Sequence, residues 1–398
     1  MSYHATAVDL NELRAWRLGR VREQLSIKGY GAILLFDPIN IRYALDAKNM
    51  QVWTMHNRVK YAFIPAEGKT VLFDFSGCEH LSKGNPSVGE IRSAKSATYL
   101  TSGSDLEADT ADWADEIADL MKTVGAHERI ALDVCDPHMV NALRRKGLQI
   151  ENGTEVMEHA RWIKNSVEVA AMQESIDACE EGIRRMHQAL IPGITENALA
   201  SILHQSNIEL GGEWIETRLL TSGRKTKPWF QESTDKLIQV GEMVSFDTDS
   251  IGPNGYCADI SRSWICGGGK GTSEQRDAYK IAYEQLQFNL ELMRPGRSLR
   301  DISQGAFKLP SRCDETFYSM IAHGVGLCDE APLIRHAWSL SATGRDNIVV
   351  EPGMVFCVES LVALNTGFEC VKLEDQILIT EKGMEILSSA PFELDLLT

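Results

Sequence analysis

The sequence has no long apolar segment: no uninterrupted apolar run approaches the roughly 18 residues that a membrane-spanning helix needs. The N-terminal stretch MSYHATAVDLNELRAWRLGR has no apolar core followed by a cleavage site, so we expect no signal peptide. Nine cysteines are present without any Cys-x-x-Cys pair, and an odd count without paired spacing is typical of reduced thiols. We therefore expect a cytoplasmic protein without membrane association, and we interpret the cysteines as small buried side chains rather than as the reactive groups.

Positive charge is also scarce. The chain has 40 Lys and Arg against 56 Asp and Glu, which gives a formal net charge of −16. Such a chain repels phosphate groups, so nucleic acid is excluded as a partner. A small positively charged molecule is not excluded.

The length and composition predict two globular domains. A chain of 398 residues with 43% apolar and 24% charged residues is too long for one ordinary core. The first third alternates helix-like and strand-like pieces, which indicates an α/β domain. A polar stretch, ENGTEVMEHARWIKNSVE, then leads into a strongly periodic helix that ends at IPG. We place the domains at residues 1–158 and 159–398.

The second domain shows a weak internal repeat. Two long predicted helices end at Pro-Gly pairs that begin at Pro192 and Pro295. Each half then reaches a strand introduced by a glycine and Met-Val, in GEMVSFDTDS and PGMVFCVESLVAL. Repeats of this length favour duplicated halves with a site between them.

Both repeated strands carry acidic residues where apolar ones would be expected. Asp247 and Asp249 are two positions apart, so on an extended strand both side chains would point to one face. Asp259 follows after a turn-rich connection. In the other half, Glu359 and Glu374 lie on two predicted strands joined by a turn at 365–367. Each half therefore supplies a hairpin with an acid on each strand.

Burial of these carboxylates requires compensating charge, because each buried ion alone costs several kcal/mol. Arg262 and Lys372 are nearby cations, but two cations cannot neutralise five carboxylates. A pair of divalent or trivalent metal ions can, and oxygen-rich sites with one imidazole suit manganese, iron, cobalt or zinc. His323 is the expected nitrogen ligand, and Gly324 and Gly326 would let the backbone approach the site closely.

The order Asp, Asp, His, Glu, Glu resembles the creatinase and prolidase-like family of pita-bread metallopeptidases. The resemblance covers nearly the whole chain and includes GAILLFDPINIRYAL, ARWIKNSVEVAAM, NGYCADISRSW, AHGVGLCDEAP, VES and KLEDQILITEKGMEIL. It implies a creatinase-type N-terminal α/β domain and a pita-bread catalytic domain with a pseudo-twofold repeat. It also implies two bound metal ions, with Asp247, Asp259, His323, Glu359 and Glu374 as ligands.

Three departures from the family pattern change the expected chemistry. The stretch FDTDS adds Asp249, which is either a sixth metal ligand or a residue beside the site that adjusts it; its position beside Asp247 favours ligation. The peptidases have two further histidines around the scissile bond, but here SGRKTKPWF places Trp229 and DEAP places Asp329 at those positions. Tryptophan cannot polarise a carbonyl, and an ionised aspartate would repel an oxyanion, so peptide hydrolysis is disfavoured. A carboxylate at position 329 is instead a candidate general base.

This combination resembles one group within the family, the metal-dependent dimethylsulfoniopropionate (DMSP) lyases of the DddP type found in marine bacteria. The resemblance implies cleavage of DMSP to dimethyl sulfide, acrylate and a proton by β-elimination. The substrate carboxylate would bind the metals and Asp329 would take the proton from the adjacent carbon. Tyr318 could donate a hydrogen bond to the substrate carboxylate or to Asp329, and Trp229 and Trp53 are candidate aromatic contacts for the sulfonium.

Several alternatives stay open at this point. The resemblance favours iron, with manganese, cobalt, zinc or nickel also compatible, and it implies a homodimer. An Xaa-Pro peptidase or creatinase-like hydrolase is the main rival function, and a non-catalytic binding module on the same fold is the second. The five inward-facing acids count against the binding module.

Overall fold

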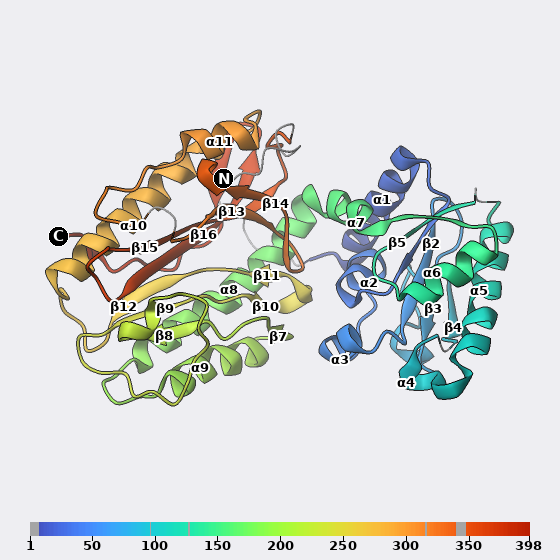
Figure 1. The fold of residues 1–398 in the computed structure, drawn as a ribbon, viewed down its shortest axis with the longest axis horizontal. Helices are drawn as coiled ribbons and strands as arrows, with labels where there is room; N and C mark the ends of the chain where they lie inside the picture. The colour runs from blue at the N-terminus through green and yellow to red at the C-terminus, as the bar shows by residue number, and fades with distance from the viewer. Residues whose placement is uncertain (1–7, 96, 126–127, 315–316, 340–347) are drawn as a thin grey trace. The chain divides into compact units, whose positions relative to one another are not determined.

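The structure of the chain is a computed structural model that describes residues 8–95, 97–125, 128–314, 317–339 and 348–398. These residues form two compact units, and the division falls between Arg161 and Trp162 (Figure 1).

The N-terminal unit is built on a six-stranded mixed sheet in the order β4-β3-β2-β1-β5-β6. Strand β1 runs antiparallel to β2 and parallel to β5. The main elements are α1 (Leu10–Lys28), β1 (Ala32–Leu35), α2 (Pro38–Leu45), α3 (Gln51–His56), β2 (Tyr61–Pro65), β3 (Val71–Asp74), β4 (Glu90–Ser93), α4 (Tyr99–Ser102), α5 (Leu106–Thr123), β5 (Arg129–Leu132), α6 (Pro137–Arg145), β6 (Gln149–Asn152) and α7 (Gly153–Trp162). The α/β architecture expected from the sequence is confirmed.

Local sequence signals explain the ends of these elements. The Asp9 side chain accepts hydrogen bonds from the first turn of α1, and Gly29 ends the helix in the left-handed conformation at φ 64°. Strands β2 and β3 form an antiparallel hairpin, and Gly68 in its turn has φ 104°. Apolar side chains of the sheet and of α5, Trp113 among them, form the core.

The described residues of the C-terminal unit form two helix pairs and three sheets. Its helices are α8 (Ser166–Ala189), α9 (Glu196–Glu209), α10 (Ser273–Leu292) and α11 (Leu299–Gly305). Its strands are β7 (Trp214–Ile215), β8 (Leu220–Ser222), β9 (Met243–Phe246), β10 (Ser250–Ile251), β11 (Cys257–Ala258), β12 (Arg262–Ile265), β13 (Met320–Val325), β14 (Asp329–Arg335), β15 (Val355–Ala363), β16 (Cys370–Thr380) and β17 (Gly383–Ile386). The sheet orders are β11-β10-β7, β12-β9-β8 and β14-β13-β15-β16-β17.

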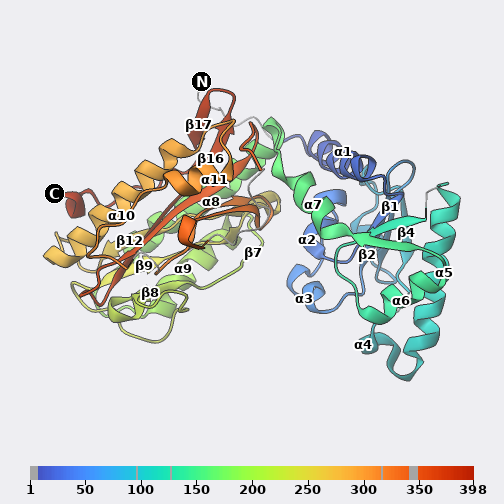
Figure 2. The ribbon, with the colours of Figure 1, turned by 45° about the horizontal axis from the view of Figure 1, so that its top comes forward.

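The predicted repeat is visible in this unit. Helix α8 starts at an Asn165 cap, and a Pro-Gly turn separates it from α9. Helix α10 starts at Ser273, and the second Pro-Gly turn separates it from α11 in the same way. In Figures 1 and 2, the strands lie between α10 on one side and α8 with α9 on the other. Each helix pair thus covers its own group of strands, which is the duplicated arrangement expected of a pita-bread fold.

One local expectation is wrong. The sequence interpretation placed Asp247 and Asp249 on one extended strand, but β9 ends at Phe246 and β10 begins at Ser250. Asp249 has φ 37°, in the left-handed region, so the chain bends between the two acids. The acids lie close together through this bend rather than through strand alternation.

None of the helices described is both long enough and apolar enough to cross a membrane.

Candidate metal centre

The C-terminal unit gathers acids from both halves of its repeat. Asp247, Asp249 and Asp259 offer ligand atoms that all lie within 4.8 Å of one another. A second group with the same spacing contains Asp259, His323, Cys357 and Glu374. Asp259 belongs to both groups, which is the arrangement of two neighbouring ion sites joined by a shared carboxylate.

Different strands position these side chains. Asp259 lies between β11 and β12, and His323 lies on β13. Glu359 on β15 stands directly opposite Glu374 on β16 in the antiparallel register. His323, Glu359 and Glu374 therefore lie on central strands of the five-stranded sheet, which position side chains more precisely than loops do.

The ring of His323 is oriented by the backbone carbonyl of the next residue, Gly324. Its Nδ1 lies 3.0 Å from the carbonyl oxygen of Gly324, so the Nδ1–H can donate to that oxygen. Its Nε2 then faces the acids, at 3.4 Å from Asp259 Oδ2 and 3.4 Å from Glu374 Oε1. Burial alone would lower the pKa of His323, but the charges of Asp329, Asp259 and Glu374 outweigh burial and raise the pKa well above its usual value. An orienting hydrogen bond on Nδ1 with Nε2 directed inward is the usual preparation of a histidine ligand.

Three acids on the first half of the repeat cannot all be ionised without compensation. Burial, together with the charge of Asp247, raises the pKa values of Asp249 and Asp259 well above the usual range. For Asp247, burial raises the pKa, but the positive charge of Lys372 together with hydrogen bonds to Asp259 and Ser261 outweighs burial, so the pKa is lowered. Without a metal ion, the cluster therefore retains protons that a metal ion would displace.

Lys372 contacts several acids of the cluster, which was not predicted from the sequence. It is fully buried, and its Nζ lies 2.6 Å from Glu359 Oε2, 3.4 Å from Asp247 Oδ2 and next to Glu374 Oε2. Arg262, by contrast, pairs with Asp375 and donates to the backbone carbonyl oxygen of Glu374, not to a carboxylate of the cluster. The sequence KLE at 372–374 could have indicated the contact of Lys372 with Glu374, because alternate residues of a strand point to the same face.

Ser261 also contacts the cluster and was not predicted. Its hydroxyl lies within hydrogen-bond distance of Asp247 Oδ1 and of Glu374 Oε2, at 2.8 Å from the latter. No pattern in the sequence pointed to this serine.

The residues fit a metal pair by a test that does not depend on the spacing. Asp259 Oδ1 and Glu374 Oε1 are buried, and neither has a hydrogen-bond partner among the residues that the structure describes. Buried carboxylate oxygens without partners are costly, and an ion bound beside them would remove that cost. A set of carboxylate oxygens with one imidazole suits manganese, iron, cobalt or zinc. The assignment of individual ligands stays a prediction.

Asp249 is held by the loop that precedes β8. Its Oδ2 accepts a hydrogen bond from the Thr217 hydroxyl, and its backbone carbonyl accepts one from Glu216 at 3.0 Å. One carboxylate oxygen of Asp249 is therefore engaged by Thr217, and Oδ1 is left for another partner.

Cys357 is an unpredicted member of the second group. Burial raises the pKa of its thiol well above the usual value, with the surrounding acids adding to the effect. A protonated thiol is a weak ligand, so the acids and His323 are the stronger candidates.

Asp329 lies beside the cluster without belonging to either group. It is the first residue of β14, and its Oδ1 lies 3.6 Å from His323 Nδ1. Its side chain is 53% exposed, whereas those of Asp259 and Glu374 are buried. Desolvation of its carboxyl raises its pKa to about 6, with Glu374, Asp247 and Glu359 adding to the rise and His323 opposing it. Asp329 is thus an accessible carboxylate with an elevated pKa at the rim of the cluster.

Tyr318 contacts the cluster through Glu359 and not through Asp329, and its contact with a substrate carboxylate stays a prediction. Its hydroxyl donates to Glu359 Oε2 at 2.7 Å, and no hydrogen bond to Asp329 is formed. Burial and the charge of Glu359 raise the pKa of Tyr318 well above its usual value, so the phenol stays a donor at neutral pH.

The two tryptophans proposed to contact the sulfonium lie in different surroundings. Trp229 is only 6% exposed and packs in an apolar cluster with Leu361 and Cys370. Trp53 belongs to the N-terminal unit, on α3, where it is 42% exposed and packs against Phe75. Their contact with a substrate stays a prediction.

The two glycines after His323 serve the hairpin of β13 and β14. A Cβ atom on Gly324 would lie 2.5 Å from the carbonyl oxygen of Ala331, and one on Gly326 would lie 2.3 Å from Glu330 Oε1. Glu330 in turn pairs with buried Lys164 at 3.1 Å. The glycines therefore give room to β14 and to this ion pair, which is a different reason from the close approach to the site that the sequence suggested.

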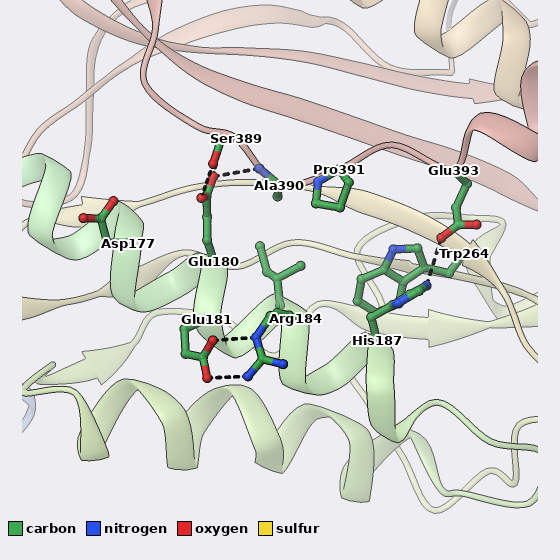
Figure 3. A pocket seen from close by; sticks show the side chains of 11 residues that line it. Asp177, Glu180, Glu181, Arg184, His187, Trp264, Ser389, Ala390, Pro391 and Glu393 are labelled. Atoms are coloured by element: carbon green, nitrogen blue, oxygen red, sulfur yellow. Dashed lines mark hydrogen bonds and ion pairs between the residues drawn. The ribbon is translucent and has the colours of Figure 1, made fainter. Parts of the chain in front are cut away.

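One cavity of this unit is lined by acids that all have partners. It has a volume of about 500 Å³ and lies between α8 and the C-terminal segment (Figure 3). Its acids are all engaged: Glu181 pairs with Arg184, Glu393 with His187, Glu180 with the backbone of Ser389 and Ala390, and Asp177 with Gln173. The interactions around this cavity hold the C-terminal segment against α8.

Comparison with known proteins agrees with this geometry. Residues 170–381 match the sequence pattern of metallopeptidase family M24. The dimethylsulfoniopropionate lyase DddP of Roseovarius nubinhibens is 39% identical over 391 residues, which cover 97% of this chain and 87% of that protein. The protein of the same name from Roseobacter denitrificans is 38% identical, with coverage of 98% and 89%.

The fold is shared with a solved prolidase. The enzyme from Pyrococcus horikoshii superposes with a TM-score of 0.75 over 95% of this chain and 99% of its own, at 18% sequence identity. The family pattern and the DddP relatives, together with the shared fold and the acid cluster, lead to one conclusion: the chain belongs to metallopeptidase family M24 and resembles its DddP-type members.

Proposed function

We propose that the chain is a metal-dependent DMSP lyase that converts dimethylsulfoniopropionate to dimethyl sulfide, acrylate and a proton. Asp329 removes a proton from the carbon next to the substrate carboxylate. The electron pair of that C–H bond forms the new carbon–carbon double bond, and the carbon–sulfur bond breaks with its electrons leaving on sulfur. Charge balances, because the zwitterion gives a neutral sulfide, an acrylate anion and a proton.

The metal pair, when bound, would supply positive charge beside the substrate carboxylate and so stabilise the negative charge that develops on it. Asp247, Asp249, Asp259, His323, Glu359 and Glu374 are the residues proposed to hold the ions. The phenol of Tyr318 and the ammonium of Lys372 both contact Glu359 and keep that carboxylate in one orientation. Iron is the ion that we favour.

One observation carries this proposal: Asp329 combines access to solvent with an elevated pKa of about 6, 3.6 Å from His323. A general base works best when its pKa lies near the working pH, because it is then largely ionised yet still basic. The two DddP relatives support the same substrate, since both carry the name of DMSP lyases.

The test mixes purified protein of measured metal content with DMSP and with Xaa-Pro dipeptides. We expect dimethyl sulfide in the headspace and no dipeptide cleavage. Cleavage of the dipeptides without release of dimethyl sulfide, at full metal occupancy, would favour the peptidase function that other members of the family suggest. Binding of DMSP without any product would favour a binding module.

A further inference from the structure

Phe230 is an exposed aromatic residue with an unusual backbone. It directly follows the buried Trp229, and its own side chain is 69% exposed. Its φ of 66° lies in the left-handed region, where a bulky residue without glycine's freedom is strained. Strain of this kind persists only where the surrounding structure imposes it, and it is concentrated at functional positions.

The surrounding loop holds Phe230 on both sides. On the N-terminal side, Trp229 anchors the chain in the apolar cluster. On the C-terminal side, the Gln231 amide donates to the carbonyl oxygens of Lys225 at 3.0 Å and Pro228 at 2.8 Å. The backbone is therefore fixed so that residue 229 is buried and residue 230 remains accessible.

The ring of Phe230 lies beside Tyr318, which contacts the acid cluster. Its centroid is 6.0 Å from that of Tyr318, with the rings inclined at 43°. Tyr318 in turn donates its hydroxyl to Glu359. Two contacts thus connect the exposed ring to a carboxylate of the candidate metal centre, and both residues belong to the C-terminal unit.

We propose that Phe230 and Tyr318 form an aromatic wall that binds the cationic end of an onium carboxylate. This inference rests on the proposed function, because it places the substrate carboxylate at the cluster and the sulfonium away from it. The faces of aromatic rings attract soft cations of this type. Trp229 is buried, so the exposed ring that its loop offers for this contact is that of Phe230. Phe230 is then a residue that determines specificity for a charged leaving group.

The ordinary alternative is that Phe230 is one more exposed apolar side chain. Scattered exposed apolar residues are normal on protein surfaces and need no function. Phe288, on α10, is an example: it is 44% exposed and packs only edge-on against Phe307. What distinguishes Phe230 is the combination of strained backbone, fixed loop and contact with Tyr318.

The experiment compares two ligands of the same shape that differ in charge. DMSP carries a dimethylsulfonium group, and 4-methylpentanoate carries an isopropyl group at the same position. Calorimetric titration of metal-loaded protein in an Asp329→Asn background measures both affinities without turnover. We expect tighter binding of DMSP, and we expect Phe230→Leu to reduce the ratio of the two affinities about five- to twenty-fold. Leucine keeps most of the apolar volume but has no aromatic face.

Two further variants distinguish the effect of the Phe230 ring from the effect of its backbone conformation. Phe288→Leu is the matched control and should leave the affinity ratio unchanged. Phe230→Gly should lose the preference for DMSP while raising the melting temperature, because glycine relieves the left-handed strain.

An unchanged affinity ratio in Phe230→Leu would overturn the inference even if the enzyme releases dimethyl sulfide. A reduced ratio in a protein that never cleaves DMSP would support the aromatic wall and overturn the proposed lyase function. Failure of DMSP to bind at all would overturn both.

Discussion

Glu359 and Glu374 face each other across the central strand pair β15–β16, and the ammonium group of Lys372 lies between their carboxylates. The same ammonium group lies 3.4 Å from Asp247, so it connects acids from both halves of the repeat. One buried cation cannot balance this many acids. The arrangement therefore leaves a deficit of positive charge that two metal ions would correct.

Replacement of Lys372 tests this charge balance. Lys372→Met should lower the free energy of unfolding of the metal-free protein by about 3–5 kcal/mol, because removal of one partner leaves buried charges without compensation. The loss should be smaller after metal loading, since the ions supply part of the missing charge. Denaturant unfolding with and without metal measures both values. Lys372→Arg, which keeps the charge, is the control; equal losses in the two metal states would contradict the charge-deficit argument.

Removal of the proposed base should separate catalysis from metal binding. Asp329→Asn should lower kcat for DMSP cleavage at least about 100-fold, which is the usual contribution of a general base. The metal content should stay at the wild-type value, because Asp329 lies outside both groups of closely spaced ligand atoms. Metal analysis and headspace detection measure the two properties. Asp301→Asn, at an exposed position on α11, is the matched control, and loss of metal in Asp329→Asn would make Asp329 a ligand or a structural residue instead.

The activity should depend on pH through the ionisation of Asp329. The base acts in its ionised form, and its pKa is raised to about 6. The value of kcat/KM should therefore be at its plateau by pH 7 and fall with a midpoint at about pH 6 or below. Bound metal ions would move the midpoint downward, because positive charge favours the carboxylate. A midpoint above pH 8 would assign the base to another group.

Metal removal should reverse the dependence of stability on pH. In the metal-free protein, the pKa values of Asp249 and Asp259 are raised above their unfolded values, so folding favours the protonated forms. Stability from such groups is complete below the unfolded pKa, near 4, and declines as the pH rises toward the folded pKa. The raised pKa of His323 acts in the same direction at higher pH.

Protein from which a chelator has removed the metal should consequently have a lower melting temperature at pH 8 than at pH 5. Metal-loaded protein should not show this loss, because the ions displace the protons and bind more tightly as the pH rises. Thermal unfolding of both forms at the two pH values gives the comparison. A metal-free protein that is most stable at pH 8 would mean that the acids are compensated by other groups.

The sequence predicted the fold where local signals agreed with packing. Helix α8 follows the apolar periodicity predicted for it and ends before the Pro-Gly turn. The repeat was visible because the Pro-Gly turns end helices in both halves. The bend at Asp249 was not predictable, because two alternating acids after an apolar run are compatible with a longer strand.

The candidate site was predictable in its residue types and less so in its contacts. Acids at strand positions signal a charged site, which made Asp259, His323 and Glu374 recognisable before their distances were known. The partner of the Tyr318 hydroxyl and the accessibility of residues 229 and 230 depend on how distant segments pack together. Sequence spacing carries no information on that packing, so the exposed ring of Phe230 was missed beside the more prominent tryptophan.

The most direct test of the account follows the proton that Asp329 is proposed to remove. DMSP with deuterium on the carbon next to the carboxylate competes with ordinary DMSP for metal-loaded protein, and the isotopic composition of the remaining substrate is followed as dimethyl sulfide is released. We expect the ordinary substrate to be consumed faster, with dimethyl sulfide and acrylate formed in equal amounts. Equal consumption of the two substrates, or formation of dimethyl sulfide without acrylate, would contradict proton abstraction followed by elimination.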